Sequence, residues 1–123
     1  MTTTSSCTQL VTAMTVRTSR VDANQAEVVE ALRKVGWSVA LTHEVGKGFP
    51  DLVVAKDGYT LLVEVKNGEA GKLTRQQVEF MSNWTGDVVV VRSAEDAILA
   101  VTAARFVAAM RTVGSVMDRA IQP

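Results

Sequence analysis

The chain has 123 residues, with thirteen basic and thirteen acidic side chains, so its formal net charge is zero. This length suits one domain with a modest hydrophobic core, and the zero charge argues against tight non-specific binding to plain duplex DNA. Single copies of cysteine and histidine exclude a disulfide framework, a thiolate metal site and a histidine cluster within this sequence.

The first 20 residues are rich in Thr and Ser and show no hydrophobic periodicity, which predicts a mobile N-terminal tail that contains Cys7. The N-terminus lacks the basic and apolar pattern of a secretory signal, and we see no stretch long enough to cross a membrane. We therefore expect a cytoplasmic protein with no membrane partner.

The first helix is predicted to begin at Asp22 and to stop near Gly36. One apolar stripe runs along it and contains Val28, Leu32 and Val35. Glu27 lies on the border of this stripe, and Asn24 lies on its apolar side near the helix start.

Residues 37–42 alternate well enough to form the first strand, and residues 43–49 form the loop that follows it. Gly48, like Gly46, lets the backbone approach a phosphate closely or adopt a positive φ, and Lys47 between them can contact phosphate. A flexible turn explains the same glycines equally well. We expect His43 to have a structural or DNA-contacting role.

Two carboxylates interrupt a sequence that otherwise predicts a buried β-hairpin. Asp57-Gly58 is a favoured two-residue turn, and counting outward from it places Asp51 directly opposite Glu64 on one face. The Cβ atoms of such a pair lie roughly 4.5–5.5 Å apart. Lys66 points to the same face because side chains alternate along a strand. The other residues are apolar on both faces, which predicts central strands covered by helices.

Two carboxylates at this separation repel each other unless a cation lies between them. Oxygen ligands suit Mg²⁺ or Mn²⁺, which can polarise a phosphoryl oxygen and lower the pKa of a water. Lys66 would then position the water or stabilise charge on the phosphate. Asp51, Glu64 and Lys66 therefore indicate a metal-dependent site for phosphodiester hydrolysis. The alternative is a buried ion-pair cluster that only stabilises the hairpin.

A second helix is predicted from Leu73 to about Trp84. Thr74 and Gln77 fit a capping box, which is one explanation for Gln77, and a place beside the active site is the other. The two explanations do not exclude each other.

Lys72 and Arg75, at the start of this helix, are candidate phosphate contacts, with ordinary surface solvation as the alternative. Residues 88–91 form an apolar run that predicts a buried strand parallel to the strand of Glu64.

From Ser93 the pattern is helical almost to the C-terminus, with Ser93 as the N-cap. Three residues are expected to cover the sheet: Ile98, Leu99 and Val101. A later apolar stripe contains Phe106, Met110, Val113 and Met117. This helix is longer than a small sheet needs. Its last part can pack on a second subunit, after a break near Gly114, or fold back on its own domain.

The order Gly-x-Pro-Asp, a short hairpin and Glu-Val-Lys resembles the PD-(D/E)XK nuclease superfamily, and most of all its small VRR-NUC and Holliday-junction-resolvase-like phage members. The resemblance covers roughly residues 22–98. It implies that Lys66 and Gln77 serve catalysis beside the two carboxylates. The metal ligands that it implies are Glu27, Asp51, Glu64 and the backbone carbonyl of Val65. For nucleic-acid binding we expect Lys47, Gly48, Lys72 and Arg75.

We therefore expect an α/β, restriction-endonuclease-like core over residues 21–98, in the order α-β-β-β-α-β, with a mixed sheet flanked by helices. Residues 99–123 are expected to form a C-terminal helical extension that supports a homodimer. The expected function is Mg²⁺- or Mn²⁺-dependent cleavage of DNA, selective for branched forms such as Holliday junctions or flaps. If the chain is phage-encoded, it would act in the host cytoplasm.

Three alternatives stay open at this point. The chain could be a non-catalytic DNA-binding subunit with a nuclease fold, or a sequence-specific restriction-type endonuclease. It could also be a small assembly or regulatory protein that acts through its C-terminal helix.

Overall fold

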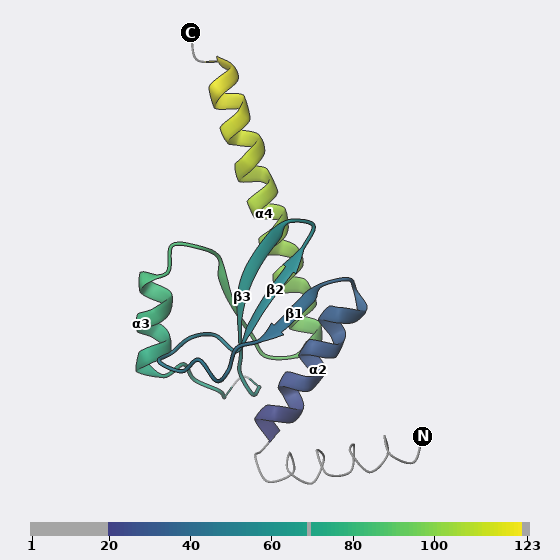
Figure 1. Ribbon diagram of the computed structural model, residues 1–123, viewed down its shortest axis with the longest axis vertical. Helices are drawn as coiled ribbons and strands as arrows, with labels where there is room; N and C mark the ends of the chain where they lie inside the picture. The colour runs from purple at the N-terminus through teal and green to yellow at the C-terminus, as the bar shows by residue number, and fades with distance from the viewer. Residues whose placement is uncertain (1–19, 69, 122–123) are drawn as a thin grey trace.

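A computed structural model describes residues 20–68 and 70–121 of the chain (Figure 1). In chain order they form helix α2 (Arg20–Lys34), strands β1 (Ser38–Leu41), β2 (Leu52–Lys56) and β3 (Tyr59–Val65), helix α3 (Arg75–Asn83), strand β4 (Val88–Val91) and helix α4 (Ala94–Ile121). This is the expected α-β-β-β-α-β core with one more helix. The expected N-terminal tail, with Cys7, lies outside the described residues apart from Arg20.

The four strands form one mixed sheet in the order β1-β2-β3-β4. β1 pairs with β2 and β2 with β3 in antiparallel fashion, whereas β4 runs parallel to β3. The parallel partner was expected from the helix that separates β3 from β4, because a parallel connection needs a crossover. β1 and β4 are the edge strands, so the hairpin that carries both carboxylates occupies the centre of the sheet.

The turn chemistry of the hairpin sets its register. Asp57 and Gly58 both have positive φ, 50° and 82°, as a two-residue turn of this kind requires. Lys56 pairs with Tyr59, and the ladder continues to the pair Leu52 and Val63. One further step places Asp51 opposite Glu64, so the register predicted from the sequence is confirmed.

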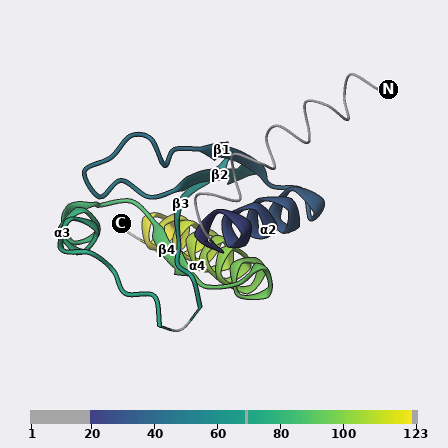
Figure 2. The same ribbon diagram turned by 90° about the horizontal axis from the view of Figure 1, so that it is seen from below.

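α2 and α4 cover one face of the sheet and also pack against each other (Figure 2). The core between them consists of residues that are at most 8% exposed: Val28, Val29, Leu32, Trp37, Leu52, Val54, Leu61, Val63, Val65, Val91, Ala97 and Val101. The alternation of β2 and β3 thus directs one side-chain set into this core and leaves Asp51 and Glu64 for the opposite face.

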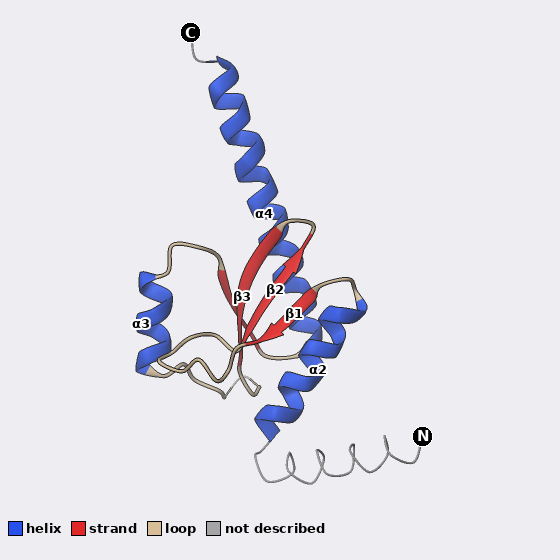
Figure 3. Ribbon diagram, in the orientation of Figure 1, coloured by secondary structure: helices blue, strands red, loops and turns tan. Residues whose placement is uncertain are grey.

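The opposite face is only partly buried. α3 lies to one side of the sheet (Figure 3). It follows the connection from β3, and the loop between β1 and β2 reaches it at Gly48. Each of its nine residues is at least partly exposed. The expected mixed sheet flanked by helices is confirmed, and on this second face Leu62 and Glu64 are buried while Val53 and Ala55 stay half-buried.

Three details of the helices differ from the expectation. α2 already includes Arg20, because neither Arg20 nor Val21 is a helix breaker. Val35 is 41% exposed because the helix ends one residue earlier, where the apolar period no longer applies. Leu99 is 66% exposed, and the sheet is contacted instead by Ala97 and Val101, which flank Leu99 on the opposite side of the helix.

α4 continues through Gly114 without a break and extends beyond the sheet (Figure 1). It does not fold back. Ser93 caps it by accepting a hydrogen bond at Oγ from the N–H of Asp96, at 3.0 Å, as expected. Two arginines bind it to turns of the sheet: Arg105 to Asp57 at 2.6 Å and Arg111 to Asp87 at 3.0 Å.

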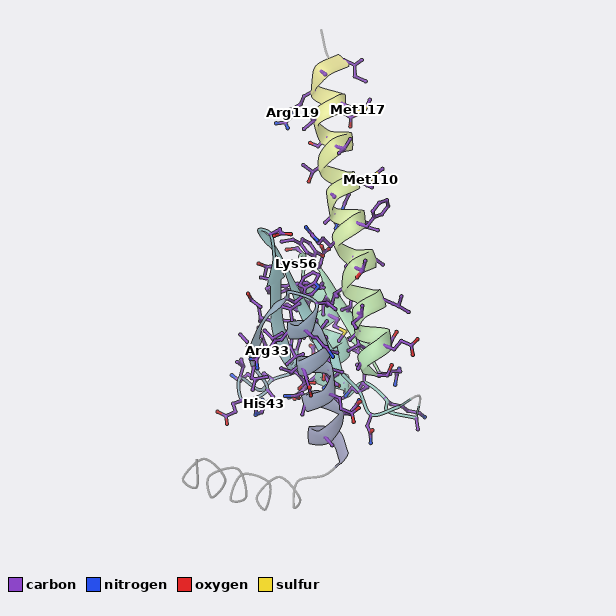
Figure 4. The ribbon with its side chains drawn as sticks, turned by 90° about the vertical axis from the view of Figure 1, so that its right-hand side faces the viewer. Arg33, His43, Lys56, Met110, Met117 and Arg119 are labelled. Carbon is purple, nitrogen blue, oxygen red and sulfur yellow. The ribbon has the colours of Figure 1, made fainter. Side chains whose placement is uncertain are left out.

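The stripe on the projecting part of α4 is exposed. Phe106, Met110, Val113 and Met117 keep between 51% and 66% of their surface. Figure 4 shows Met110 and Met117 on the side of α4 that is turned away from the sheet. By length and composition alone, α4 is also apolar enough to span a membrane, with a mean hydropathy of 1.4 over 18 residues. The expectation that no stretch reaches that length was therefore wrong.

Candidate active site

The two carboxylates predicted from the sequence lie together at the end of the hairpin. Asp51 accepts a hydrogen bond at Oδ2 from the backbone N–H of Val65, at 3.0 Å. This bond ties the start of β2 to the end of β3 and fixes the Asp51 carboxylate beside Glu64. Lys66 directly follows β3, with its Nζ 3.9 Å from Oε1 of Glu64. The trio of Asp51, Glu64 and Lys66 is thus assembled as expected.

Glu64 is the unusual member of the trio. Only 2% of its side chain is exposed, and its Oε2 has no hydrogen-bond partner among the described residues. Burial raises the pKa of Glu64 to about 8, and the nearby charge of Asp51 adds to the shift, whereas Lys66 opposes it. A buried carboxylate with one unsatisfied oxygen is costly, so this arrangement is poorly explained by fold stability alone.

Gln77 on α3 supports the other oxygen of Glu64. Its Nε2 donates a hydrogen bond to Oε1 of Glu64 at 2.9 Å, while its Oε1 accepts one from the N–H of Thr74 at 2.8 Å. Thr74 in turn accepts at Oγ1 from the N–H of Gln77, which completes the capping box. Both explanations for Gln77 therefore hold at once, because its side-chain amide caps α3 and also bonds the Glu64 carboxylate.

Gly48 holds the loop before β2 against α3. Its φ is +80°, and a Cβ atom there would lie 2.3 Å from the backbone oxygen of Gln76. Only glycine allows the two backbones to approach this closely. Gly46 also has positive φ, but a Cβ atom there would meet nothing within 4 Å. The close approach seen at Gly48 is to α3, and its predicted contact with phosphate stays a prediction.

Asn24 holds the strand ends that carry the site. Its Nδ2 donates to the carbonyl of Lys66 at 2.8 Å and to the carbonyl of Arg92 at 3.4 Å. These carbonyls follow the neighbouring parallel strands β3 and β4, so one amide bridges both strands and α2. Asn24 therefore fixes the strand ends beside Glu64 and Lys66 through backbone contacts.

The remaining predicted side chains are exposed. Glu27 lies one turn after Asn24 on α2. Among the described residues, no three acidic, His or Cys side chains lie close enough together to hold a metal ion, so Glu27 does not join Asp51 and Glu64 in such a cluster. Three basic side chains are also exposed: Lys47, Lys72 and Arg75. The exposed His43 lies in the loop after β1.

The chemistry of this site fits a divalent cation. The unsatisfied Oε2 of Glu64 offers a free ligand atom, and Asp51 places a second carboxylate beside it. A cation between the two would remove both the repulsion and the cost of burying an ionised group. Hard oxygen donors of this kind suit Mg²⁺ or Mn²⁺.

A groove along α3 was not predicted from the sequence. This α3 groove has a volume of about 480 Å³ and is lined by Lys47, Gln76, Glu79, Phe80, Asn83 and Trp84. Aromatic residues spaced by four on an exposed helix were the available hint, because they share one face.

Comparison with known proteins gives one informative result. A solved structure described as a VRR_NUC domain is similar to this chain, with a TM-score of 0.58 and 26% sequence identity. The match covers 68% of this chain and 96% of that one, so the similarity extends over nearly the whole of that domain. A scan of protein-family models finds no match, and a search of curated proteins finds none either.

Proposed function

We propose, for a chain whose fold is that of a VRR-NUC nuclease domain, that it hydrolyses DNA phosphodiester bonds with a divalent metal ion held by Asp51 and Glu64. The observation that carries the proposal is the buried, unsatisfied Oε2 of Glu64 beside Asp51 in the centre of the sheet. A site with these costs is expected where function requires it. The similarity to a VRR_NUC domain supports the nuclease class.

Each residue of the site has a distinct task in this proposal. Asp51 and Glu64 would hold Mg²⁺ or Mn²⁺, with the carbonyl of Val65 as an auxiliary ligand. The cation supplies charge that lowers the pKa of a water and polarises a phosphoryl oxygen. Lys66 would position the attacking water and stabilise negative charge on the phosphate. Its ammonium lies close enough to Glu64 to act on the same centre.

Gln77 is a positioning residue for Glu64. Its hydrogen bond engages Oε1 and leaves Oε2 available as a ligand. Because the same amide caps α3, the position of the helix and the orientation of the carboxylate depend on each other. Lys47, Lys72 and Arg75 are proposed to contact phosphates around this centre.

We further propose that branched DNA, such as a flap or a Holliday junction, is cut in preference to plain duplex. A formal net charge of zero gives little general attraction to the DNA backbone, so recognition must come from local shape and specific contacts.

The test is cleavage of end-labelled four-way junction, flap, single-stranded and linear duplex DNA in Mg²⁺, Mn²⁺ or EDTA, by the wild type and by Glu64→Ala. We expect metal-dependent cleavage that Glu64→Ala abolishes, with branched substrates cut fastest. Equal cleavage of all forms would contradict the selectivity. Metal-independent cleavage, or none of any substrate, would contradict the proposed activity, and DNA binding without cleavage would favour a non-catalytic subunit.

The active form is proposed to be a homodimer that pairs through α4. If two copies of α4 run antiparallel about a point between residues 111 and 112, Phe106 faces Met117 of the partner subunit and Met110 faces Val113 of the partner subunit. Apolar side chains of the two subunits thus meet across one symmetric interface. Two of the three arginines of α4, Arg105 and Arg111, are directed away from this stripe because they bind Asp57 and Asp87.

Light scattering after size-exclusion chromatography tests this arrangement. We expect the mass of two chains for the wild type and of one chain for Met110→Glu. The matched control Ser115→Glu, on the other side of the same helix, should keep the dimer. A monomeric wild type would contradict the homodimer.

A further inference from the structure

A series of three aromatic rings ends in the α3 groove. Phe49 meets Phe80 edge-on, with ring centroids 5.2 Å apart, and Phe80 stacks on Trp84 with centroids 5.3 Å apart and planes 19° from parallel. Phe49 and Phe80 are half-buried, whereas Trp84 is 42% exposed. The inner two rings are explained by packing of α3 on the loop before β2. The large exposed ring at the end of the series is not.

The indole of Trp84 is held in place on two sides. Phe80 stacks on it, and Gly86 leaves the space that the ring occupies, because a Cβ atom on Gly86 would lie 2.8 Å from its Nε1. An exposed ring that is held in this way offers a flat surface at little cost in conformational entropy.

The polar lining of the α3 groove suits a nucleotide better than a simple anion. Lys47 supplies a positive charge, and Gln76 and Asn83 supply amide donors and acceptors. Glu79, the carboxylate of the groove, disfavours a bare phosphate. The volume of about 480 Å³ lies in the range of small-ligand sites. A base can use the ring and the amides, while its phosphate uses Lys47.

The groove is connected to the site of the proposed nuclease. Gln77, which bonds Glu64, lies one helical turn before Phe80, and Gly48 holds Lys47 and its loop against the backbone of Gln76. A strand that passes the carboxylates could therefore continue along α3.

We propose that the α3 groove binds an unpaired nucleotide of the DNA strand that enters the active site, with its base on Trp84 and its phosphate on Lys47. This rests on the proposed function and deepens it, because a base inside a duplex is stacked between its neighbours and cannot reach a protein ring. The groove then explains how the enzyme selects DNA with an unpaired segment, such as a flap or an opened junction.

Tryptophan fluorescence tests the groove without relying on cleavage. The full-length chain carrying Glu64→Gln, which should not cleave DNA, is titrated with oligo(dT) of about ten nucleotides and with a blunt duplex of the same length. Trp84 and Trp37 are the two tryptophans, and Trp37 is 4% exposed and packed against Tyr59. Quenching by oligo(dT) but not by the duplex is therefore expected, and it should report on Trp84.

Variants in the same background identify the contacts. Trp84→Ala should lose the quenching and bind oligo(dT) about tenfold more weakly, whereas Trp84→Phe should lose the quenching but bind within about threefold of the parent. Lys47→Gln should make the dependence of log K on log salt shallower by about 0.7. Val78→Ala, also on α3 but outside the groove, is the matched control and should change neither quantity.

The outcomes separate this inference from the proposed function. Three results would overturn nucleotide binding in the α3 groove. They are no quenching at saturating oligo(dT), no binding of oligo(dT), or unchanged affinity of Trp84→Ala with an unchanged melting temperature. If the wild type still cuts DNA in a Glu64-dependent way, the nuclease stands without it. Quenching and weaker binding of Trp84→Ala, together with no cleavage by the wild type, would support the groove and overturn the activity.

Discussion

Replacing Glu64 by Gln should stabilise the metal-free protein, and the gain should grow with pH. Glutamine keeps the shape of the side chain and a hydrogen-bond acceptor for Gln77, but it cannot ionise. Burial raises the pKa of Glu64 from 4.5 to about 8. The folded wild type binds this proton more tightly than the unfolded state does. Protonation of Glu64 therefore stabilises the wild type fully below pH 4.5, and this contribution is lost as pH rises toward 8.

The magnitude follows from this window. Within it, each pH unit removes about 1.4 kcal/mol from the free energy of unfolding of the wild type. Between about pH 5.5 and about pH 7, the advantage of Glu64→Gln should therefore grow by about 2 kcal/mol. For a chain of this length, that corresponds to a difference in Tm that widens by about 8 °C. Groups that titrate alike in both proteins cancel in the difference.

The assay is thermal unfolding of both proteins in EDTA, followed by circular dichroism across this pH range. Saturating Mn²⁺ should reverse the order, because it binds the folded wild type and not the variant. A difference between the two proteins that stays constant with pH would refute the reasoning, since it would mean that Glu64 ionises as it does in water.

Three further predictions follow from the supporting contacts. Gly48→Ala should displace α3 and reduce cleavage strongly, whereas Gly46→Ala, which has a similar φ but open space, should cost only about 1 kcal/mol of stability and keep most activity; equal effects on cleavage rate and Tm would contradict the close approach. Asn24→Ala should lower the free energy of unfolding by about 1–2 kcal/mol in chemical denaturation, because the carbonyl of Lys66 loses its partner, and an unchanged midpoint would contradict this bond. Gln77→Ala should slow cleavage and weaken Mn²⁺ binding, and Gln77→Glu should retain the cap of α3 but restore neither quantity.

The centre of the fold could be predicted from the sequence because its signals are local. Asp57-Gly58 fixes the hairpin turn, and side-chain alternation then determines which residues face Asp51 across the sheet. The fold class and the resemblance to a VRR-NUC nuclease are confirmed by the structure and the comparison. Gln77 was predictable to the same degree, because its capping partner lies only three residues away.

The parts that sequence patterns missed depend on contacts between distant segments. The exposure of Leu99 follows from which side of α4 meets the sheet, and small residues such as Ala97 fit that close contact better than leucine does. The α3 groove forms only because Gly48 holds a distant loop on α3. Neither the spacing of Phe80 and Trp84 nor the charge of Lys47 indicates that they meet.

The central claim is that Asp51 and Glu64 together hold the divalent cation with which this nuclease fold cuts DNA. Calorimetric titration with Mn²⁺ tests it most directly, on the wild type, Glu64→Gln and Lys66→Met. We predict that the wild type and Lys66→Met bind Mn²⁺ with similar affinity and that Glu64→Gln does not, although Lys66→Met no longer cuts DNA. Unchanged Mn²⁺ binding by Glu64→Gln, or no binding by the wild type, would contradict the account.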